Sequence, residues 1–513
     1  MSEEKKVTSV NRAKLYQLVL FPMNNGATNV YYILTMNFIA YYANGVLGLL
    51  LMFATTMVTV MRLFDAVTDP IIGALIDRTS TRFGKFRPYM VLGNVIMIVS
   101  SLLLYFGTRI ISPDMKWLQY VCFVLFYALY VIGYTFQTAC TRSGQTCLTN
   151  DPKQRPLFTV FNTVASLIGM GLVQFLAPIL SEKLGGYNSA AFFDFMIPLA
   201  IVVSAVLTGL AVIGIAEKDR PEFFGVGNQQ EKVKLSEYVA ILKANKELQR
   251  LMVAGAGCKL AFSIATNMTV LCMLYGAMMG NYGGLYLPMM IVGYVFSVPF
   301  FLLTVRTSQK HGQKASLVRY TGLALIMYVG ILVLLLLWKQ GNAAFTLSLS
   351  SLNIYSILFI LCFGIGYGAY YATADMPIPM VADCSDYETY RSGRYIPGIM
   401  GTLFSLVDKL VSSLGSTIVG AAVAMIGIQT LPDGNTPYAD GMHGVVIVLF
   451  CVVPMLAWVA TLIAMKGYTL TGARMKEIQA VNAARKAGIS QGMTLEEAME
   501  QWKTLEDVPE EFR

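Results

Sequence analysis

Apolar stretches of roughly 20 residues, separated by shorter polar segments, recur along the whole chain. Each stretch is long enough to cross a lipid bilayer as a helix. The pattern predicts an all-α polytopic membrane protein with twelve transmembrane helices. The predicted spans begin near Gln17, Val46, Pro88, Trp117, Leu157, Phe192, Leu251, Gly284, Ala315, Asn353, Ile396 and His443.

One long polar segment divides these spans into two groups of six. We therefore expect an N-terminal six-helix bundle at residues 1–216, a cytoplasmic linker at 217–250, a C-terminal six-helix bundle at 251–467 and a cytoplasmic tail at 468–513. The tail has the pattern of two short helices. We interpret it as a solvated segment, with a regulatory role as the alternative.

The two halves share short sequence similarities. "DRTSTRFGKFR" (Asp77–Arg87) follows the second predicted span, and "VRTSQKHGQKA" (Val305–Ala315) follows the eighth. Arg-Thr-Ser and a glycine six residues after the arginine coincide in the two segments. A Gly-Tyr pair also recurs, at Gly133 and at Gly366. Such internal similarity favours a transporter built from two related bundles, with its binding site between them.

The composition and the placement of charge narrow the class of protein. The chain is 56% hydrophobic and 13% charged, with a formal net charge of +8. Its basic residues follow the predicted topology, which argues against a nucleic-acid partner. The loops of one side hold only a few of them, namely Arg109, Lys116, Lys183 and Lys339. This asymmetry predicts that both termini are cytoplasmic. We expect a monomer in the lipid bilayer of a bacterial inner membrane.

The second predicted span, "RLFDAVTDPIIG", holds three charges. Arg62, Asp65 and Asp69 stand at i, i+3 and i+7, so they share one helix face, and Thr59 extends the polar stripe. Asp65 would lie about 18 Å from the cytoplasmic end of the span, close to the bilayer centre. A carboxylate there costs about 2.5–3.5 kcal/mol unless it meets a cation, a proton or a basic partner. We expect a Na⁺ or H⁺ site, with an internal salt bridge as the alternative.

Two further predicted spans each contain a lysine. Lys409, in span eleven, belongs to a polar stripe with Ser405, and the acids of span two are its candidate partners. A lysine that changes partner when a cation arrives would couple ion binding to helix movement. Lys259, in span seven, lies near the cytoplasmic end, and we expect it to snorkel to the surface.

These motifs identify a family. "RLFDAVTDPIIGALIDRTSTRFGKFRPYMVLG", "ADCSDYETYRSGR" and "GTLFSLVDKLVSSLGSTIVG" resemble the glycoside–pentoside–hexuronide:cation symporters, the family of the melibiose permease. The resemblance covers essentially the whole membrane domain. It implies a major facilitator fold, alternating access and sugar import coupled to Na⁺ or H⁺. By position, Asp65 and Asp69 match the cation-site acids of the family, and Lys409 matches its span-eleven lysine.

The sequence departs from the melibiose branch at four positions that the resemblance assigns to the sugar pocket. Asn29 and Thr138 stand where that branch has acids, Asn162 where it has an arginine and Arg142 where it has a tryptophan. Two acidic groups are lost and one basic group is gained. The resemblance therefore predicts a kept ion site beside an altered sugar pocket.

Several other side chains are candidates for substrate binding. Tyr134, Thr138 and Arg142 share a face of span four, and Asn25, Asn29 and Tyr32 share a face of span one. Amides, hydroxyls and aromatic faces suit a polyhydroxylated ring, although Asn and Thr also join helices.

Arg142 needs an anion if it lies within the membrane. The Gly-Tyr repeat makes Asp375 in span ten its symmetry mate, so the two residues could form a gate across the cavity. Alternatively, Arg142 binds a substrate carboxylate, which would favour an acidic glycoside such as a hexuronide. We also expect a second, cytoplasmic gate, with ordinary salt bridges within loops as the alternative. Its basic group is Arg82, Lys85 and Arg87, and its acidic group is Asp383, Asp386 and Glu388.

Other function classes fit the sequence less well. A transporter of a non-sugar amphiphile, such as a lysolipid, is the main alternative. The chain contains no His-Glu-x-x-His, Gly-x-Ser-x-Gly or phosphate-binding glycine motif, so we do not expect an enzyme. Its eight cysteines show no close pairing, which is typical of reduced apolar residues. No cofactor is expected beyond the coupling ion.

Overall fold

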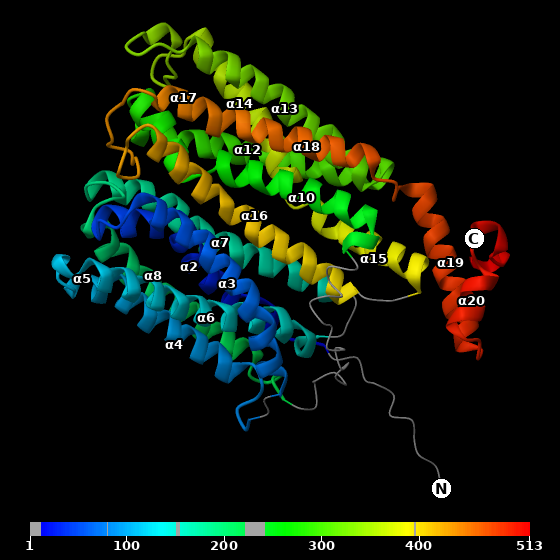
Figure 1. Cartoon of the computed structure of the whole chain (residues 1–513). Helices are drawn as coiled ribbons and strands as arrows, with labels where there is room; N and C mark the ends of the chain where they lie inside the picture. Colours follow the sequence, from blue (N-terminus) through cyan, green and yellow to red (C-terminus); the bar gives the residue numbers. More distant parts are fainter. Residues whose placement is uncertain (1–11, 79–80, 150–153, 221–241, 394–396, 513) are drawn as a thin grey trace. The chain divides into compact units, whose positions relative to one another are not determined.

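The computed structural model describes residues 12–78, 81–149, 154–220, 242–393 and 397–512. Within these ranges every long regular element is a helix (Figure 1). The first half contains α1 (Leu15–Leu20), α2 (Met23–Tyr41), α3 (Leu51–Arg78), α4 (Arg87–Leu102), α5 (Thr108–Ile110), α6 (Lys116–Leu148), α7 (Gln154–Lys183) and α8 (Ala190–Ile215).

The second half contains α10 (Lys246–Ala265), α11 (Met268–Leu271), α12 (Tyr282–His311), α13 (Gln313–Leu337), α14 (Ile354–Thr373), α15 (Pro377–Ser392), α16 (Pro397–Met425), α17 (Met442–Val446), α18 (Val453–Gly467), α19 (Gly472–Ser490) and α20 (Leu495–Gln501). Short π-helical turns continue several of these helices, as at Tyr42–Val46 after α2 and at Ile447–Val452 between α17 and α18.

Ten helices in the described ranges are long and apolar enough to cross a membrane. An eleventh span is added if Lys246–Ala265 and Met268–Met278, which meet at a bend of 45°, are counted as one. The predicted first span corresponds to α2, which has 19 residues and includes four asparagines. It is not among the ten helices that are long and apolar enough to cross a membrane. The all-α polytopic fold is therefore confirmed, while the count of twelve spans stays a prediction.

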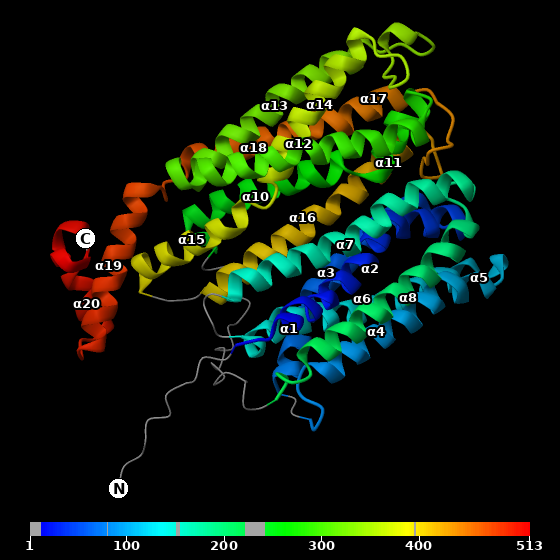
Figure 2. The same cartoon turned by 180° about the vertical axis from the view of Figure 1, so that it is seen from behind.

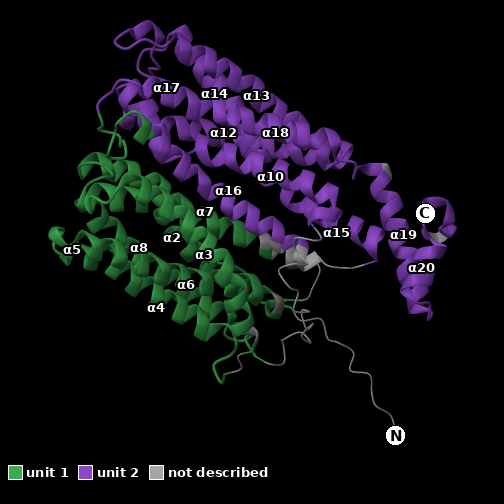
Figure 3. Cartoon of the chain, viewed as in Figure 1, with its two compact units in different colours: residues 1–230, 423–436 green, residues 231–422, 437–513 purple. Residues whose placement is uncertain are grey.

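The chain forms two compact units (Figure 3). Unit 1 comprises residues 1–230 and 423–436, and unit 2 comprises residues 231–422 and 437–513. The division near residue 230 falls inside the linker that we predicted at 217–250. The two units differ from the predicted domains at two places. The segment 423–436, predicted in the C-terminal bundle, belongs to unit 1, and the tail, predicted as a separate segment, belongs to unit 2.

Backbone conformation supports the internal repeat. Gly84 has a φ angle of 101°, and Gly312, at the matching position of the second segment, has a φ angle of 88°. Residues other than glycine rarely adopt this left-handed region, so both turns require the glycine that the two sequences share. The recurring Gly-Tyr pair also has a similar structural setting in both halves. Gly133 lies against α4, and Gly366 lies against α13. The pairs α4–α6 and α13–α14 pack closely within their own units (Figure 2).

The segment 423–436 is held to unit 1 by buried amide groups. Asn44 donates a hydrogen bond of 3.0 Å to the Gln429 carbonyl and accepts one of 2.8 Å from the Leu431 N–H. Asn188 donates to the Leu431 carbonyl at 2.8 Å. Leu431 is only 2% exposed. Chain order had placed this segment in the second bundle, but order alone does not determine where a connecting segment packs.

The C-terminal tail is folded and packs on α15 (Figure 1). Arg485 is 7% exposed and donates two hydrogen bonds, of 2.9 and 2.7 Å, to the Trp502 carbonyl. It donates a third bond of 2.7 Å to the Tyr390 carbonyl at the end of α15. Burial lowers the pKa of the Arg485 guanidinium. The two short helices that the tail's sequence pattern predicted are present as α19 and α20, and an apolar cluster around Val481 and Trp502 anchors them.

Candidate functional site

The charged residues of α3 meet α6 in unit 1. Asp65 is 1% exposed, and both of its carboxylate oxygens have partners. Its Oδ2 lies 3.3 Å from Arg62 Nη1, and its Oδ1 accepts a hydrogen bond of 2.8 Å from Thr135 of α6. The Thr68 and Thr135 hydroxyl oxygens are 3.2 Å apart. The buried carboxylate thus contacts a guanidinium and the Thr135 hydroxyl, in keeping with the need of a buried charge for partners.

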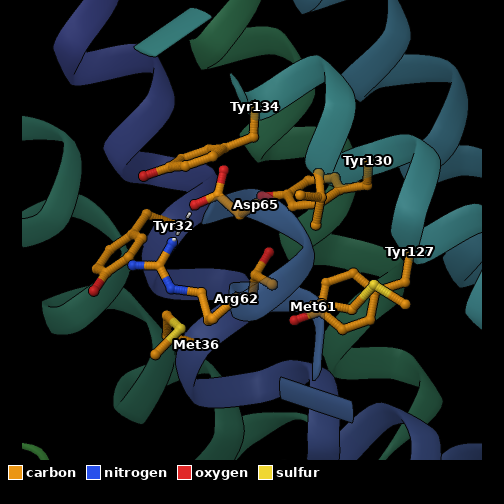
Figure 4. A pocket seen from close by; sticks show the side chains of 10 residues that line it. Tyr32, Met36, Met61, Arg62, Asp65, Tyr127, Tyr130 and Tyr134 are labelled. Carbon is orange, nitrogen blue, oxygen red and sulfur yellow. Dashed lines mark hydrogen bonds and ion pairs between the residues drawn. The ribbon is translucent and has the colours of Figure 1, made fainter. Parts of the chain in front are cut away.

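A pocket opens beside this carboxylate (Figure 4). Its cavity volume is about 20 Å³, which is room for about one water molecule. The Arg62 guanidinium lies 5.0 Å from the centre of the Tyr32 ring, an attractive cation–π geometry. Tyr32 and Tyr134 stack at 6.3 Å. The full lining consists of Tyr32, Thr35, Met36, Met61, Arg62, Asp65, Tyr127, Tyr130, Val131 and Tyr134.

This pocket combines apolar ring faces with a few polar groups. Arg62 Nε is a buried donor without a hydrogen-bond partner among the described residues. Such an N–H can bind an oxygen of a ligand at little desolvation cost, since it is already out of water. The arrangement suits a small ring that carries hydroxyl groups.

The second acid of α3 has a basic partner that the sequence did not predict. Asp69 Oδ2 lies 3.7 Å from Arg142 Nη1 of α6. The Asp69 side chain is 25% exposed and the Arg142 side chain is 66% exposed. Each acid of the predicted cation site therefore has an arginine beside it, and the charges of these four side chains cancel.

The predicted asparagines of α2 and α7 lie together. Asn29 donates a hydrogen bond of 3.0 Å to Asn25 Oδ1, and Asn25 donates one of 3.2 Å to the Asn162 carbonyl. The helices approach closely because Gly26 has no side chain. A methyl group there would lie 2.9 Å from the Ala165 carbonyl oxygen. Asn162 Oδ1 is buried and has no hydrogen-bond partner among the described residues, so it offers an acceptor.

Two predicted site residues of unit 1, Thr138 and Thr59, are not among the residues that line the pocket beside Asp65. Thr138 uses its hydroxyl within its own helix, donating at 3.2 Å to the Tyr134 and Thr135 carbonyls. Thr59 is half-buried on α3, three residues before Arg62.

Unit 2 contains a second set of charged side chains. Lys259 of α10, which we predicted to snorkel, has its Nζ 2.6 Å from Asp375 Oδ1 and 3.8 Å from Asp408 Oδ1. Lys409 of α16 is 8% exposed, and the half-buried Ser405 precedes it by one helical turn. Asp375, the proposed gate partner of Arg142, thus has a basic partner within its own unit.

The basic residues of the predicted cytoplasmic gate lie on a loop that one buried acid organises. Asp219 is 1% exposed and accepts hydrogen bonds from the backbone N–H groups of Lys85, Phe86 and Arg87, at 2.8 to 3.2 Å. Arg87 Nε also lies 3.5 Å from Asp219 Oδ2. Arg82 packs its guanidinium 4.7 Å from the centre of the Phe83 ring.

The acidic residues of that predicted gate lie on α15. Asp386 accepts a hydrogen bond of 2.9 Å at its carbonyl from Asn482 of the tail. Asp383 lines a second pocket of unit 2, beside His311 and Lys314, with a cavity volume of about 180 Å³. A pairing of these acids with the basic loop stays a prediction.

The sequence interpretation missed Thr135, Tyr127 and Tyr130. Threonines are common in these spans, so nothing marked Thr135 as the partner of Asp65. The tyrosines did carry a signal, because Tyr127, Tyr130 and Tyr134 stand at i, i+3 and i+7. This spacing equals that of the charged residues on α3 and places three rings on one face.

The described residues contain no group of three or more His, Cys, Asp or Glu side chains that could hold a metal ion. A Na⁺ site at Asp65 and Asp69 would therefore need oxygen atoms from hydroxyl or carbonyl groups as well. Thr68 and Thr135 supply hydroxyl oxygens next to Asp65. The residues present are compatible with such a hard, oxygen-ligated cation.

Comparison with solved structures shows the fold. A bacterial homolog of the human lysosomal transporter Spinster, in an inward-facing and unoccupied conformation, aligns with a TM-score of 0.57 at 13% identity. The alignment covers 89% of this chain and 97% of that one. A bacterial homologue of the human peptide transporters PepT1 and PepT2 aligns with a TM-score of 0.58 at 11% identity, over 88% and 98% of the two chains.

Sequence comparison gives nearer relatives. The inner membrane symporter YicJ of Escherichia coli K12 is 25% identical over 93% of this chain and 96% of its own. The glucuronide carrier protein homolog of the same organism is 24% identical, over 90% and 94%. The lactose permease of Leuconostoc lactis is 29% identical over 41% of this chain and 35% of its own.

Residues 21–472 match the family described as MFS/sugar transport protein. This match spans nearly all of the predicted membrane domain. Membership in a family of transporters also confirms that the protein is not an enzyme. The chain therefore belongs to the MFS/sugar transport family, as a member of the glycoside–pentoside–hexuronide:cation symporters.

Proposed function

We propose that the protein is a secondary active transporter that couples the uptake of a glycoside to an inward flow of Na⁺ or H⁺. The observation that carries this proposal is the position of Asp65. A 1%-exposed carboxylate forms part of the wall of an aromatic pocket in unit 1. A coupling acid that lines the substrate pocket links the binding of the two solutes.

The chemistry of the pocket lining, and not its volume, supports a sugar as the substrate. Tyr32 and Tyr134 supply ring faces for the apolar side of a sugar, and Arg62 Nε supplies a donor.

Coupling is assigned to the acids of α3 and to Lys409. Asp65 and Asp69 would receive the cation, with Thr59 and Arg62 on the same helix face. Lys409, at 8% exposure, is a buried base that would exchange partners during transport. We propose that both termini are cytoplasmic, and that Arg82, Lys85 and Arg87 close the inner side with Asp383 and Asp386.

Uptake into proteoliposomes tests the proposal. Purified protein would be offered a panel of neutral and acidic glycosides, with Na⁺ and pH gradients imposed separately. Accumulation above the external concentration with one of the two gradients is expected. Uptake of no glycoside, or uptake that is indifferent to both ions, would refute it. Inclusion of a lysolipid in the panel tests the amphiphile alternative in the same assay.

A further inference from the structure

The pocket of unit 2 lies where the turn between α12 and α13 meets α15 and the start of α19. Its cavity volume of about 180 Å³ is room for several water molecules, and its lining includes Lys314, His311 and Asp383. We infer that this pocket binds a phosphate-type oxyanion, held by backbone N–H groups at the start of α13 and by Lys314. The site goes beyond the proposed transport function and does not depend on it.

The equivalent turn of unit 1 binds a carboxylate. Asp219, four residues after the end of α8, accepts hydrogen bonds of 2.8 to 3.2 Å from the successive N–H groups of residues 85–87 at the start of α4. Gly84 makes room for this acid, because a Cβ there would overlap the Asp219 carboxylate. Several N–H groups at the start of a helix can bind one anionic group together. The turn of unit 1 is thus an anion cradle that the chain fills with its own acid.

The internal repeat gives unit 2 the same turn without the acid. Gly312 matches Gly84, with a φ angle of 88° against 101°, so the N–H groups of residues 313–315 match the three N–H groups of the cradle. They begin α13 and have no hydrogen-bond acceptor among the described residues. A Cβ on Gly312 would meet no atom within 4 Å, whereas at Gly84 the acid occupies this space. Thr471, four residues after the end of α18, stands in the sequence position of Asp219 and lines the pocket, but it carries a hydroxyl group.

The other groups of the pocket favour an oxyanion that keeps a proton. Lys314 Nζ donates a hydrogen bond of 2.6 Å to the Tyr468 carbonyl, and an ammonium group has two further N–H bonds to donate. The start of α19 also opens on the cavity, and its N-cap Thr471 makes no side-chain capping bond, so a second helix N-terminus favours an anion there. Asp383 repels an anion that has no hydrogen but can accept a bond from an O–H group. Because phosphate keeps an O–H near neutral pH and sulfate does not, the pocket should prefer phosphate.

Inorganic phosphate tests the site, with the Tm of the purified full-length protein as the readout. Compared with sulfate or chloride at equal ionic strength, phosphate should raise the Tm saturably, by about 2 °C or more. Lys314→Met should lose most of this rise, whereas Lys310→Gln, on an exposed residue outside the lining, should keep it. Thr471→Asp should abolish the rise, because a carboxylate of the chain then fills the cradle as Asp219 does in unit 1. Thr471→Asn, its uncharged match, should keep the rise.

Two further comparisons identify the source of the phosphate group and the role of Asp383. Nanodiscs of phosphatidylcholine with and without phosphatidic acid present the group on a lipid. A rise in Tm there, without a rise for inorganic phosphate, would assign the site to a lipid headgroup, and a rise for inorganic phosphate would assign it to a soluble ion. Asp383→Asn should let sulfate raise the Tm as much as phosphate does, because the acid that selects for an O–H group is lost.

The inference is overturned if neither phosphate source raises the Tm of the wild type above its control. It is also overturned if the rise persists in full in both Lys314→Met and Thr471→Asp. A preference for phosphate over sulfate that survives Asp383→Asn would overturn the selection by this acid.

Discussion

Thr135 donates a hydrogen bond of 2.8 Å to Asp65, and this bond connects α6, which holds three of the four pocket tyrosines, to the buried acid of α3. Both residues are almost completely buried, with exposures of 0% and 1%. A hydrogen bond to a buried carboxylate stabilises its charged form and fixes its orientation. The site is therefore built across two helices and not on α3 alone.

Replacement of Thr135 by valine should weaken the coupling site. A hydrogen bond to a charged group contributes about 1.5–3 kcal/mol, so the apparent affinity for the coupling ion should fall roughly tenfold or more. The measurement is the ion concentration that gives half-maximal glycoside uptake. Thr135→Ser keeps the hydroxyl and is the matched control. If valine and serine behave alike, the bond does not contribute to ion binding.

The stacked rings of the pocket give a second prediction. Tyr134→Ala removes the ring that faces Tyr32, and we expect the KM for the glycoside to rise by about three- to tenfold. Tyr134→Phe keeps the ring and should change KM little. Tyr89→Leu disturbs another stacked pair of unit 1 outside the pocket lining and serves as the control. A KM that is unaffected by Tyr134→Ala would place the sugar elsewhere.

Asp219 should be essential for the fold of the loop that follows α3. It accepts hydrogen bonds from three successive N–H groups, and all three lose this acceptor in Asp219→Ala. Each unsatisfied group costs about 1–3 kcal/mol. We expect a clear fall in the Tm of the purified protein. Asp219→Asn keeps one oxygen acceptor and should lower the Tm less. Equal stability of Asp219→Ala and the wild type would show that the loop does not depend on this acid.

The folded tail leads to a prediction for limited proteolysis. Arg485→Ala removes three hydrogen bonds to the carbonyl groups of Trp502 and Tyr390. We expect the tail to detach from α15, so that chymotrypsin cleaves after Trp502 faster than in the wild type. Lys486→Ala, on the exposed neighbouring residue, is the control. An unchanged cleavage rate would mean that apolar contacts alone hold the tail.

The sequence predicted those features that depend on local pattern. Apolar periodicity located the long helices, and Gly84 and Gly312 marked a repeat that the backbone angles support. The spacing of Arg62, Asp65 and Asp69 predicted one charged helix face, and the ion pair that we gave as the alternative to a cation site is present between Arg62 and Asp65.

Contacts between distant segments were harder to predict. The Arg142–Asp69 contact depends on the relative rotation of α3 and α6, which periodicity does not determine. Asp219 lies in a polar stretch of the sequence, where an aspartate is ordinary. Its role as acceptor for three backbone N–H groups follows only from the fold of the loop around it. Likewise, the burial of Arg485 depends on carbonyl groups of residues that are far apart in the chain.

The central claim is that an ion gradient drives glycoside uptake through Asp65. Asp65→Asn keeps the size of the side chain and removes its charge, so the most direct measurement compares two modes of transport by this variant in proteoliposomes. We predict that accumulation driven by the Na⁺ or pH gradient is lost, while exchange of labelled for unlabelled glycoside continues. Accumulation at the wild-type level in Asp65→Asn would contradict the account.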